Sequence, residues 1–175
     1  GYRRQRQMCI RDRCLIGYNL TNFLLAILLS KKGFEVDIIF DEKNKSKTNN
    51  RTIGISKKNI EFLKSILNIP NQYLWPILQI EILNLENNPS KKIKFKDKKD
   101  ENFFLIRQSD LLQLSLKKCK QLKDIYFSKC TQNEILKLEK TNNYNLIVNS
   151  QSNNILIKKF FSNSIKKDYD SMAFT

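Results

Sequence analysis

The sequence predicts an α/β protein built on a parallel sheet, with an antiparallel β insertion. Residues 14–41 read as one complete strand–turn–helix–strand unit, which joins two parallel strands. Two later helical segments, 57–67 and 110–121, alternate with short β-branched and aromatic runs. Between those helices, extended runs follow one another with only turns between them, which is typical of an antiparallel meander.

The unit at 14–41 contains a complete crossover. A short apolar run over 14–16 meets Gly17 at a turn, and an apolar helix is expected over 20–32. Gly33 ends that helix, because glycine adopts the left-handed conformation at little cost. The run 34–40, FEVDIIF, then forms a second strand. This order is the first half of a Rossmann-like dinucleotide-binding fold.

The turn after the first strand departs from the usual glycine pattern. A complete G-x-G-x-x-G motif needs three glycines, and here Asn19 and Asn22 follow Gly17 at the other two positions. Asn19 can adopt a positive φ and can cap the helix. Asn22 puts a side chain where close packing of helix and strand prefers none. An ordinary βαβ unit that binds no nucleotide therefore stays as an alternative.

A helix that begins directly after a strand is a candidate anion site. Its first N–H groups, here those of Leu20 and Thr21, lack intrahelical partners, and the helix dipole is positive at this end. We therefore expect a pyrophosphate at the turn formed by Gly17, Asn19, Leu20 and Thr21. Asp41 lies about 20 residues further on, at the tip of the second strand, where a carboxylate can accept hydrogen bonds from a ribose.

The formal net charge is +15 over 175 residues. Such a charge ordinarily indicates nucleic acid or an anionic membrane as a partner. Here, however, five of the seven arginines lie within residues 1–13, and the rest of the chain uses lysine almost exclusively, together with many Asn and Ile residues. A uniform excess of this kind reflects the composition of the source genome, so we expect no nucleic-acid partner.

The arginine-rich head, residues 1–13, is unlike the rest of the sequence. Arg11, Asp12 and Arg13 stand where the first buried strand should extend, and a buried parallel strand should be continuously apolar. We therefore expect residues 1–13 to be a non-native or disordered extension, with a basic targeting peptide as the alternative. Residues 14–175 are expected to be the incomplete N-terminal part of a longer domain.

The chain has no histidine, and its four cysteines form no CxxC pair. The lack of histidine excludes Ser-His and Cys-His nucleophilic mechanisms, and we expect no metal site. Isolated thiols favour burial in a reducing compartment. The longest apolar run, 23–29, is too short to cross a bilayer. We therefore expect a soluble, cytoplasmic protein.

The remaining elements follow from cap and turn signals. Residues 51–55 are expected to be extended, with Ser56 as the N-cap of the helix 57–67. Ser109 is expected to cap the helix 110–121. The other predicted strands are 77–85, 92–95, 102–106, 124–127, 134–138 and 144–148, with a turn at 88–90 between the first two.

In this order, the segments resemble the N-terminal half of the flavoprotein aromatic hydroxylases, and most closely those of ubiquinone biosynthesis. CLIGYNLTNFLLAILLSKKGFEVDII, residues 14–39, is similar to the family's FAD-binding βαβ unit. RTIGIS, residues 51–56, is similar to an R-x-h-x-L-S segment whose arginine, here Arg51, lies near the FAD. IRQSDL, residues 106–111, is similar to a strand end where the family places Arg or Asn against the cofactor, and Gln108 takes that position.

Two later segments extend the resemblance. LIVNSQSNN, residues 146–154, stands in the place of an apolar strand followed by A-D-G-x-x-S, with Gln151 for the aspartate and Ser152 for the glycine. Residues 169–174 look like the family's next strand. The family's later G-D motif and most of its substrate-binding sheet are absent from these 175 residues.

The resemblance implies an FAD-dependent monooxygenase that uses NAD(P)H and O2. Its substrate would be a small aromatic or prenylated quinone precursor, such as a polyprenyl-phenol of the ubiquinone pathway. A polyprenylated substrate would bring the protein into peripheral contact with a membrane. The fragment is expected to be inactive alone. The predicted cofactor-binding residues are Gly17, Asn19, Leu20, Thr21, Asp41, Arg51 and Gln108.

The lost motif residues support an alternative function. Asn22, Gln151 and Ser152 replace residues that the family uses at its cofactor site. A catalytically degenerate member of the family could act instead as a scaffold or a lipid-binding partner in quinone biosynthesis. Bound flavin in the purified protein would separate the two functions.

Overall fold

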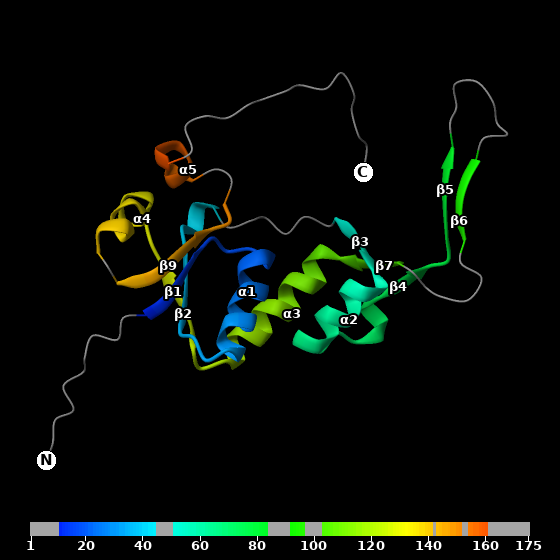
Figure 1. The fold of residues 1–175 in the computed structure, drawn as a ribbon, viewed down its shortest axis with the longest axis horizontal. Coiled ribbons are helices and arrows are strands. Elements are labelled where there is room, and N and C mark those ends of the chain that lie inside the picture. Colours follow the sequence, from blue (N-terminus) through cyan, green and yellow to red (C-terminus); the bar gives the residue numbers. More distant parts are fainter. Residues whose placement is uncertain are drawn as a thin grey trace, which may run out of the picture. The chain divides into compact units, whose positions relative to one another are not determined.

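A computed structural model describes residues 11–44, 51–83, 92–96, 103–141, 143–151 and 154–160 (Figure 1). The chain divides into two compact units. Gly1–Lys47 and Ser115–Thr175 make up the first unit, and Thr48–Leu114 makes up the second. Helix α3, Gln108–Gln121, begins in the second unit and ends in the first.

The first unit is built on a four-stranded sheet with the strand order β8-β2-β1-β9. All three pairs of neighbouring strands are parallel, which confirms the predicted parallel sheet. Helix α1, Leu20–Lys31, connects β1 to β2, as parallel strands require. The strands are β1 (Arg11–Ile16), β2 (Val36–Phe40), β8 (Ile125–Lys129) and β9 (Tyr144–Asn149).

Helices lie on both faces of this sheet. Figure 1 shows α1 on one side and α4 (Gln132–Lys137) and α5 (Ile155–Phe160) on the other. On the first side Phe23 of α1 is fully buried, and the Cys119 thiol of α3 donates a hydrogen bond to its carbonyl oxygen at 3.4 Å. On the second side a buried apolar cluster joins alternate strand residues to the two short helices, because successive side chains of a strand face opposite ways. Its buried members are Cys14, Ile16, Ile39, Ile135 and Leu156.

Helix α1 forms and ends as the sequence predicts. Its buried residues recur at a helical spacing, and they are Asn22, Phe23, Ala26, Ile27 and Ser30. Gly33 follows the helix with φ +84°, in the left-handed region where a side chain is strained. The Gly33 N–H donates to the carbonyl oxygen of Ser30 at 2.9 Å, which satisfies one of the last carbonyl groups of the helix.

Strand β1 begins three residues before the predicted start at Cys14. Arg11 pairs with Tyr144 of β9, and Arg13 pairs with Val36 of β2. The Arg13 guanidinium carbon lies 4.3 Å from the centre of the Phe34 ring, and the side chain is only half-buried. The strand can therefore include arginine, because full burial begins only at Cys14. Whether residues 1–13 are native to the chain stays a prediction.

The second unit contains the predicted antiparallel insertion. Strands β3 (Thr52–Ser56), β7 (Phe103–Arg107) and β4 (Trp75–Ile77) form one antiparallel sheet in the order β3-β7-β4. Strands β5 (Gln79–Leu83) and β6 (Lys92–Lys96) form a separate antiparallel pair. Helix α2, Lys57–Ile66, buries Ile60, Leu63 and Ile66 along one face. Three short 3-10 helices complete the two units, η1 (Glu42–Asn44), η2 (Asn71–Tyr73) and η3 (Leu138–Lys140).

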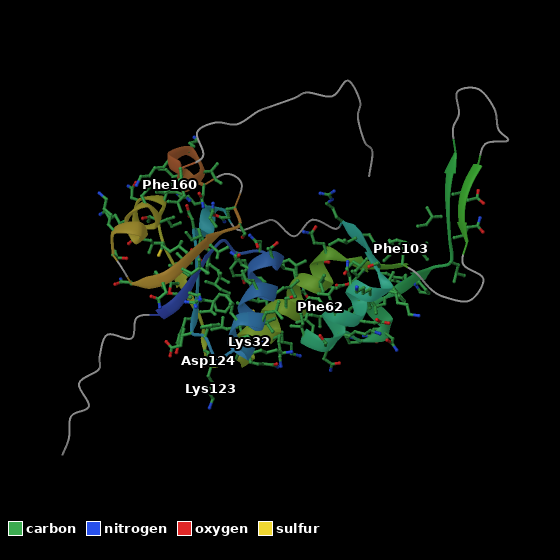
Figure 2. All side chains as sticks on the ribbon, viewed as in Figure 1. Lys32, Phe62, Phe103, Lys123, Asp124 and Phe160 are labelled. Carbon is green, nitrogen blue, oxygen red and sulfur yellow. The ribbon has the colours of Figure 1, made fainter. Side chains whose placement is uncertain are left out.

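Several apolar side chains of both units are exposed. Figure 2 labels Phe62 of α2, Phe103 of β7 and Phe160 of α5, each between 41% and 53% exposed. Leu78, between β4 and β5, is 72% exposed. Single exposed apolar residues of this kind are normal on a protein surface.

Three predicted elements need correction. The predicted strand 77–85 is two strands, because the chain leaves one sheet at Leu78 and enters the other. Helix α3 begins at Gln108, so Ser109 lies inside the helix and does not cap it. The predicted strand 134–138 is helix α4, and helix α5 was not predicted. The predicted turn 88–90 and strand 169–174 lie outside the described residues.

A capping box explains why 132–137 is helical. The Thr131 hydroxyl oxygen accepts the Glu134 N–H at 3.4 Å, and a Glu134 carboxylate oxygen accepts the Thr131 N–H at 2.7 Å. The two bonds satisfy donors at both sides of the helix start. The Thr131 hydroxyl also donates to this carboxylate oxygen at 2.8 Å. The Thr131 N–H first, and then this hydroxyl, lower the pKa of Glu134.

Removing this cap should weaken the first unit. Thr131→Ala is expected to lower the free energy of unfolding by about 1 kcal/mol, because the Glu134 N–H loses its acceptor. Urea unfolding followed by circular dichroism measures the change. Thr131→Ser keeps the hydroxyl and should unfold close to the wild type. Equal midpoints for Thr131→Ala and Thr131→Ser would show that the capping bond adds no stability.

Candidate functional site

Gly17 lies in the turn between β1 and α1. Its φ is +126°, a conformation that residues with side chains rarely adopt. Its N–H donates to the carbonyl oxygen of Ile39 at 2.8 Å, which joins the turn to the end of β2. A Cβ on Gly17 would stand 2.8 Å from Cγ of Gln151, 2.9 Å from Nδ2 of Asn19 and 3.2 Å from Oγ of Ser150. Both the backbone and the available space therefore require glycine here.

Asn19 is the N-cap of α1, as the sequence predicts. Its backbone is extended, with φ −150°, so it does not take the positive φ that the glycine pattern allows. Its Oδ1 accepts the N–H of Asn22 at 3.0 Å. Its Nδ2 donates to Oγ of Ser150 at 2.8 Å. Asn19 therefore links the start of α1 to the chain that follows β9.

Asn22 occupies the third glycine position without opening a gap between helix and strand. Its side chain is fully buried, and its Nδ2 donates to the carbonyl oxygen of Gly17 at 2.8 Å. Its Oδ1 has no hydrogen-bond partner among the described residues. The Asn22 side chain, which the sequence suggested would interfere with close packing of helix and strand, instead hydrogen-bonds the turn to the first turn of the helix.

Leu20 and Thr21 are the first two residues of α1. Because of helix geometry, N–H groups at these positions have no intrahelical acceptor. The dipole of a helix adds partial positive charge at the same end. The turn therefore offers backbone donors at the carboxyl edge of a parallel sheet, where α/β folds commonly bind ligands.

Asp41 follows directly after β2. One carboxylate oxygen accepts the Gln132 side-chain N–H at 3.1 Å, and the other accepts the Lys43 N–H at 3.0 Å. These bonds lower the pKa of Asp41, with Gln132 as the largest cause and Lys43 as the second. Asp41 is therefore an anionic acceptor at neutral pH, at the position predicted for contact with a ribose.

Ser150 and Gln151, which follow β9, lie against the Gly17 turn. Neither was a predicted site residue, and Gln151 was identified only as a replacement in a lost motif. Ile16 pairs with Asn149, so the chain after β9 comes next to the chain after β1. The Ser150 N–H donates to the carbonyl oxygen of Ile16 at 3.2 Å. The parallel topology is the signal that could have found them, because the carboxyl ends of neighbouring parallel strands meet at one edge.

Arg51 and Gln108 lie side by side in the second unit. The Gln108 N–H donates to the carbonyl oxygen of Arg51 at 2.8 Å, and the adjacent Thr52 and Arg107 are partners in the β3–β7 register. The Arg51 side chain is exposed, whereas Gln108 is half-buried. The structure thus brings together two predicted site residues that are far apart in the sequence.

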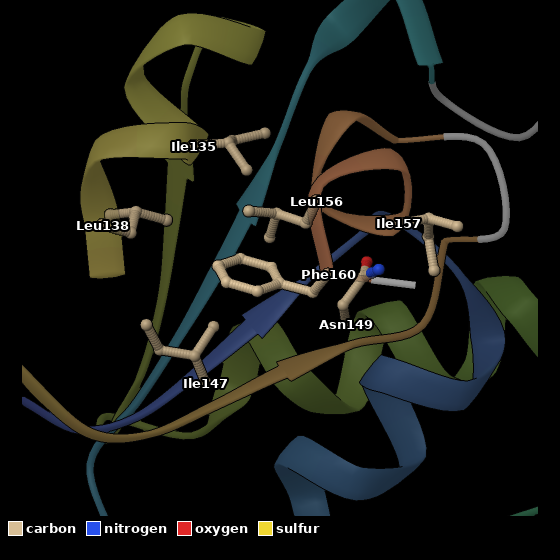
Figure 3. Close-up of a pocket in the computed structure, with 7 residues that line it drawn as sticks. All are labelled: Ile135, Leu138, Ile147, Asn149, Leu156, Ile157 and Phe160. Carbon is tan, nitrogen blue, oxygen red and sulfur yellow. The ribbon is translucent and has the colours of Figure 1, made fainter. Parts of the chain in front are cut away.

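A separate hollow lies in the first unit, on the face covered by α4 and α5 (Figure 3). Its volume is about 390 Å³. The Asn149 amide at its edge is hydrogen-bonded to Asn154, with Asn154 Nδ2 donating to Asn149 Oδ1 at 2.6 Å. The side chains that line it are Ile135, Leu138, Ile147, Asn149, Leu156, Ile157 and Phe160.

No family model matches the sequence, and no curated protein matches it. Solved structures do match. PqsL of Pseudomonas aeruginosa, a probable FAD-dependent monooxygenase, superimposes with a TM-score of 0.52 at 13% identity, over 67% of this chain and 32% of PqsL. p-Nitrophenol 4-monooxygenase PnpA of Pseudomonas putida DLL-E4 gives a TM-score of 0.54 at 14% identity, over 69% of this chain and 32% of PnpA.

A third match is 2-methyl-3-hydroxypyridine-5-carboxylic acid oxygenase, with a TM-score of 0.53 at 15% identity. It covers 68% of this chain and 31% of the oxygenase. Over the superimposed residues, the chain has the fold of the corresponding part of these oxygenases. It spans about a third of the length of each of them.

The backbone of the Gly17 turn has the form of an anion site of the kind that takes a pyrophosphate. A glycine with positive φ leads into a helix N-terminus, and a carboxylate stands at the tip of the next strand. The side chains of Asn19, Ser150 and Gln151 lie against the point that a Gly17 Cβ would occupy. The groups that would hold the nucleotide are therefore the backbone of Gly17, Leu20 and Thr21, together with the Asp41 carboxylate.

Proposed function

We propose that this chain is the nucleotide-binding portion of an FAD-dependent monooxygenase. The Gly17 turn carries the proposal, because neither its φ nor its surroundings admit a side chain, and it opens onto the N-terminus of α1. The shared fold with a probable FAD-dependent monooxygenase supports it. The motif resemblance at 14–39 and 51–56 supports it independently.

In this function five of the predicted residues bind the cofactor directly. The N–H groups of Leu20 and Thr21 hold the pyrophosphate, and Asp41 accepts hydrogen bonds from the ribose. Arg51 and Gln108, adjacent in the second unit, contact the cofactor. Bound FAD supplies the redox chemistry, and the protein binds it, orients it and excludes water.

The finer part of the proposal concerns the substrate. We propose NAD(P)H and O2 as co-substrates and a small aromatic or prenylated quinone precursor as the molecule hydroxylated. The support is the resemblance to the hydroxylases of ubiquinone biosynthesis. We propose a cytoplasmic location, and a prenylated substrate would place the protein in peripheral contact with a membrane. Among the described residues, no helix combines the length and the apolar character needed to cross a bilayer.

A second candidate function is a catalytically degenerate scaffold or lipid-binding partner in quinone biosynthesis. The observation in its favour is the occupation of the turn by Asn19, Ser150 and Gln151. A protein of this kind would bind no flavin. Flavin absorbance of the purified full chain after incubation with FAD separates the two candidates.

Substitution of Arg51 tests whether the second unit contributes to cofactor binding. Arg51→Ala is expected to weaken FAD binding by about 1–3 kcal/mol, because a charged hydrogen bond to the cofactor is lost. Its folding should be unaffected, since the side chain is exposed. Flavin absorbance per protein measures the occupancy. Lys58→Ala, which removes an exposed cation from α2, is the matched control. Equal occupancy in Arg51→Ala and Lys58→Ala would reject the role of Arg51.

A further inference from the structure

The space over the Gly17 turn is filled by three side chains of the protein itself. Asn19 caps α1 and donates from its Nδ2 to Oγ of Ser150 at 2.8 Å. Cγ of Gln151 stands 2.8 Å from the point that a Gly17 Cβ would occupy. These side chains border the turn whose backbone N–H groups a pyrophosphate would meet.

We propose that Asn19, Ser150 and Gln151 form a polar plug that closes the turn in the free protein, and that a nucleotide displaces this plug on binding. The inference rests on the proposed function, since it takes the turn as the nucleotide site. It adds that Ser150 and Gln151, which follow β9, set the affinity for the nucleotide.

At the start of α1, the Asn19 side chain occupies a donor that an anion could otherwise use. Its Oδ1 accepts the Asn22 N–H at 3.0 Å, which is one of the donors that a phosphate oxygen could use at a helix N-terminus. The bond to Ser150 holds the amide in this orientation. The nucleotide and the Asn19 side chain therefore compete for the same donor.

The plug is held by few bonds, so a ligand can displace it. Oε1 of Gln151 is buried and has no hydrogen-bond partner among the residues that the structure describes. A buried acceptor without a partner is unfavourable, and rotation of the side chain into water would satisfy it. Between Asn19 and Ser150 there is one neutral hydrogen bond. Oγ of Ser150 also donates to the carbonyl oxygen of Ile16 at 3.4 Å, and Oδ1 of Asn19 accepts the Asn22 N–H. Opening the turn therefore breaks these few neutral hydrogen bonds and frees Gln151.

Two truncations test the plug in the full chain. Ser150→Ala removes the acceptor of the Asn19 amide but leaves the Asn19 cap in place. Gln151→Ala removes the side chain that lies against Gly17. Each is expected to tighten FAD binding about three- to tenfold, the factor that corresponds to one neutral hydrogen bond or one displaced side chain. Gln121→Ala, at the exposed end of α3, should leave the affinity unchanged.

Three probes locate the effect. FAD and ADP carry a pyrophosphate, whereas riboflavin has none. Both truncations should therefore tighten FAD and ADP by similar factors and leave riboflavin unchanged. Flavin fluorescence reports on FAD and riboflavin, and calorimetry reports on ADP. Appearance of FAD binding only in the Ser150→Ala/Gln151→Ala double variant would support the plug most strongly.

The failures of the two proposals can be told apart. Wild-type binding of FAD with no change in either truncation would overturn the plug and leave the proposed function in place. Absence of FAD and ADP binding in both the wild type and the double variant, with both folded by circular dichroism, would overturn the plug and the proposed function together.

Discussion

Gly17→Val is expected to abolish FAD binding and to destabilise the first unit by about 2–6 kcal/mol. A β-branched residue at φ +126° strains the backbone, which accounts for about 1–3 kcal/mol. The new Cβ would also lie 2.8 Å from Cγ of Gln151 and 2.9 Å from Nδ2 of Asn19, and overpacking of this kind typically adds about 1–3 kcal/mol. Urea unfolding measures the stability, and flavin fluorescence measures the binding.

Gly33→Val is the matched control for this substitution. Gly33 also has a positive φ, +84°, but a Cβ there would meet no atom within 4 Å. It should therefore show the backbone strain without the crowding, and it should keep FAD binding. If the two variants lost the same stability, the side chains around Gly17 would not crowd it.

The first unit could be predicted from the sequence because its signals are local. Gly17 lies just before an apolar helix and Gly33 just after it, and each has the positive φ that makes glycine necessary. The run at 36–40, which is mostly β-branched or aromatic and follows the turn at Gly33, favours a buried strand of a parallel sheet, and all five of its residues are buried. These features need no knowledge of the rest of the fold.

The errors arose where two local signals competed. Residues 134–138 combine isoleucine and leucine in a short run, which periodicity alone cannot assign to helix or strand. The decisive signal is the Thr131 and Glu134 pair, which forms a capping box. In the second unit, the division between β4 and β5 depends on which strand each pairs with, and that information is not local.

Some residues of the candidate site could be predicted from neighbouring sequence, whereas others depend on distant strand pairing. Gly17, Asn19, Leu20 and Thr21 are consecutive or nearly so, and the sequence places them together. Ser150 and Gln151 reach the turn only because β9 pairs with β1. No short segment of the sequence determines the order of strands in a sheet. The sequence treated Gln151 as a lost motif residue, whereas the structure shows it in contact with the turn.

Among the described residues, Phe23 is the largest fully buried side chain. This side chain is fully buried on the α1 face, where its ring lies 4.9 Å from the ring of Tyr18 and 6.2 Å from that of Phe127. Phe23→Ala is expected to lower the free energy of unfolding by about 3–5 kcal/mol, because apolar contacts are lost and a cavity remains. Phe62→Ala, at a phenylalanine that is 53% exposed on α2, should change it by less than about 0.5 kcal/mol. Urea unfolding of the two variants beside the wild type measures both values, and equal losses would show that Phe23 does not anchor this core.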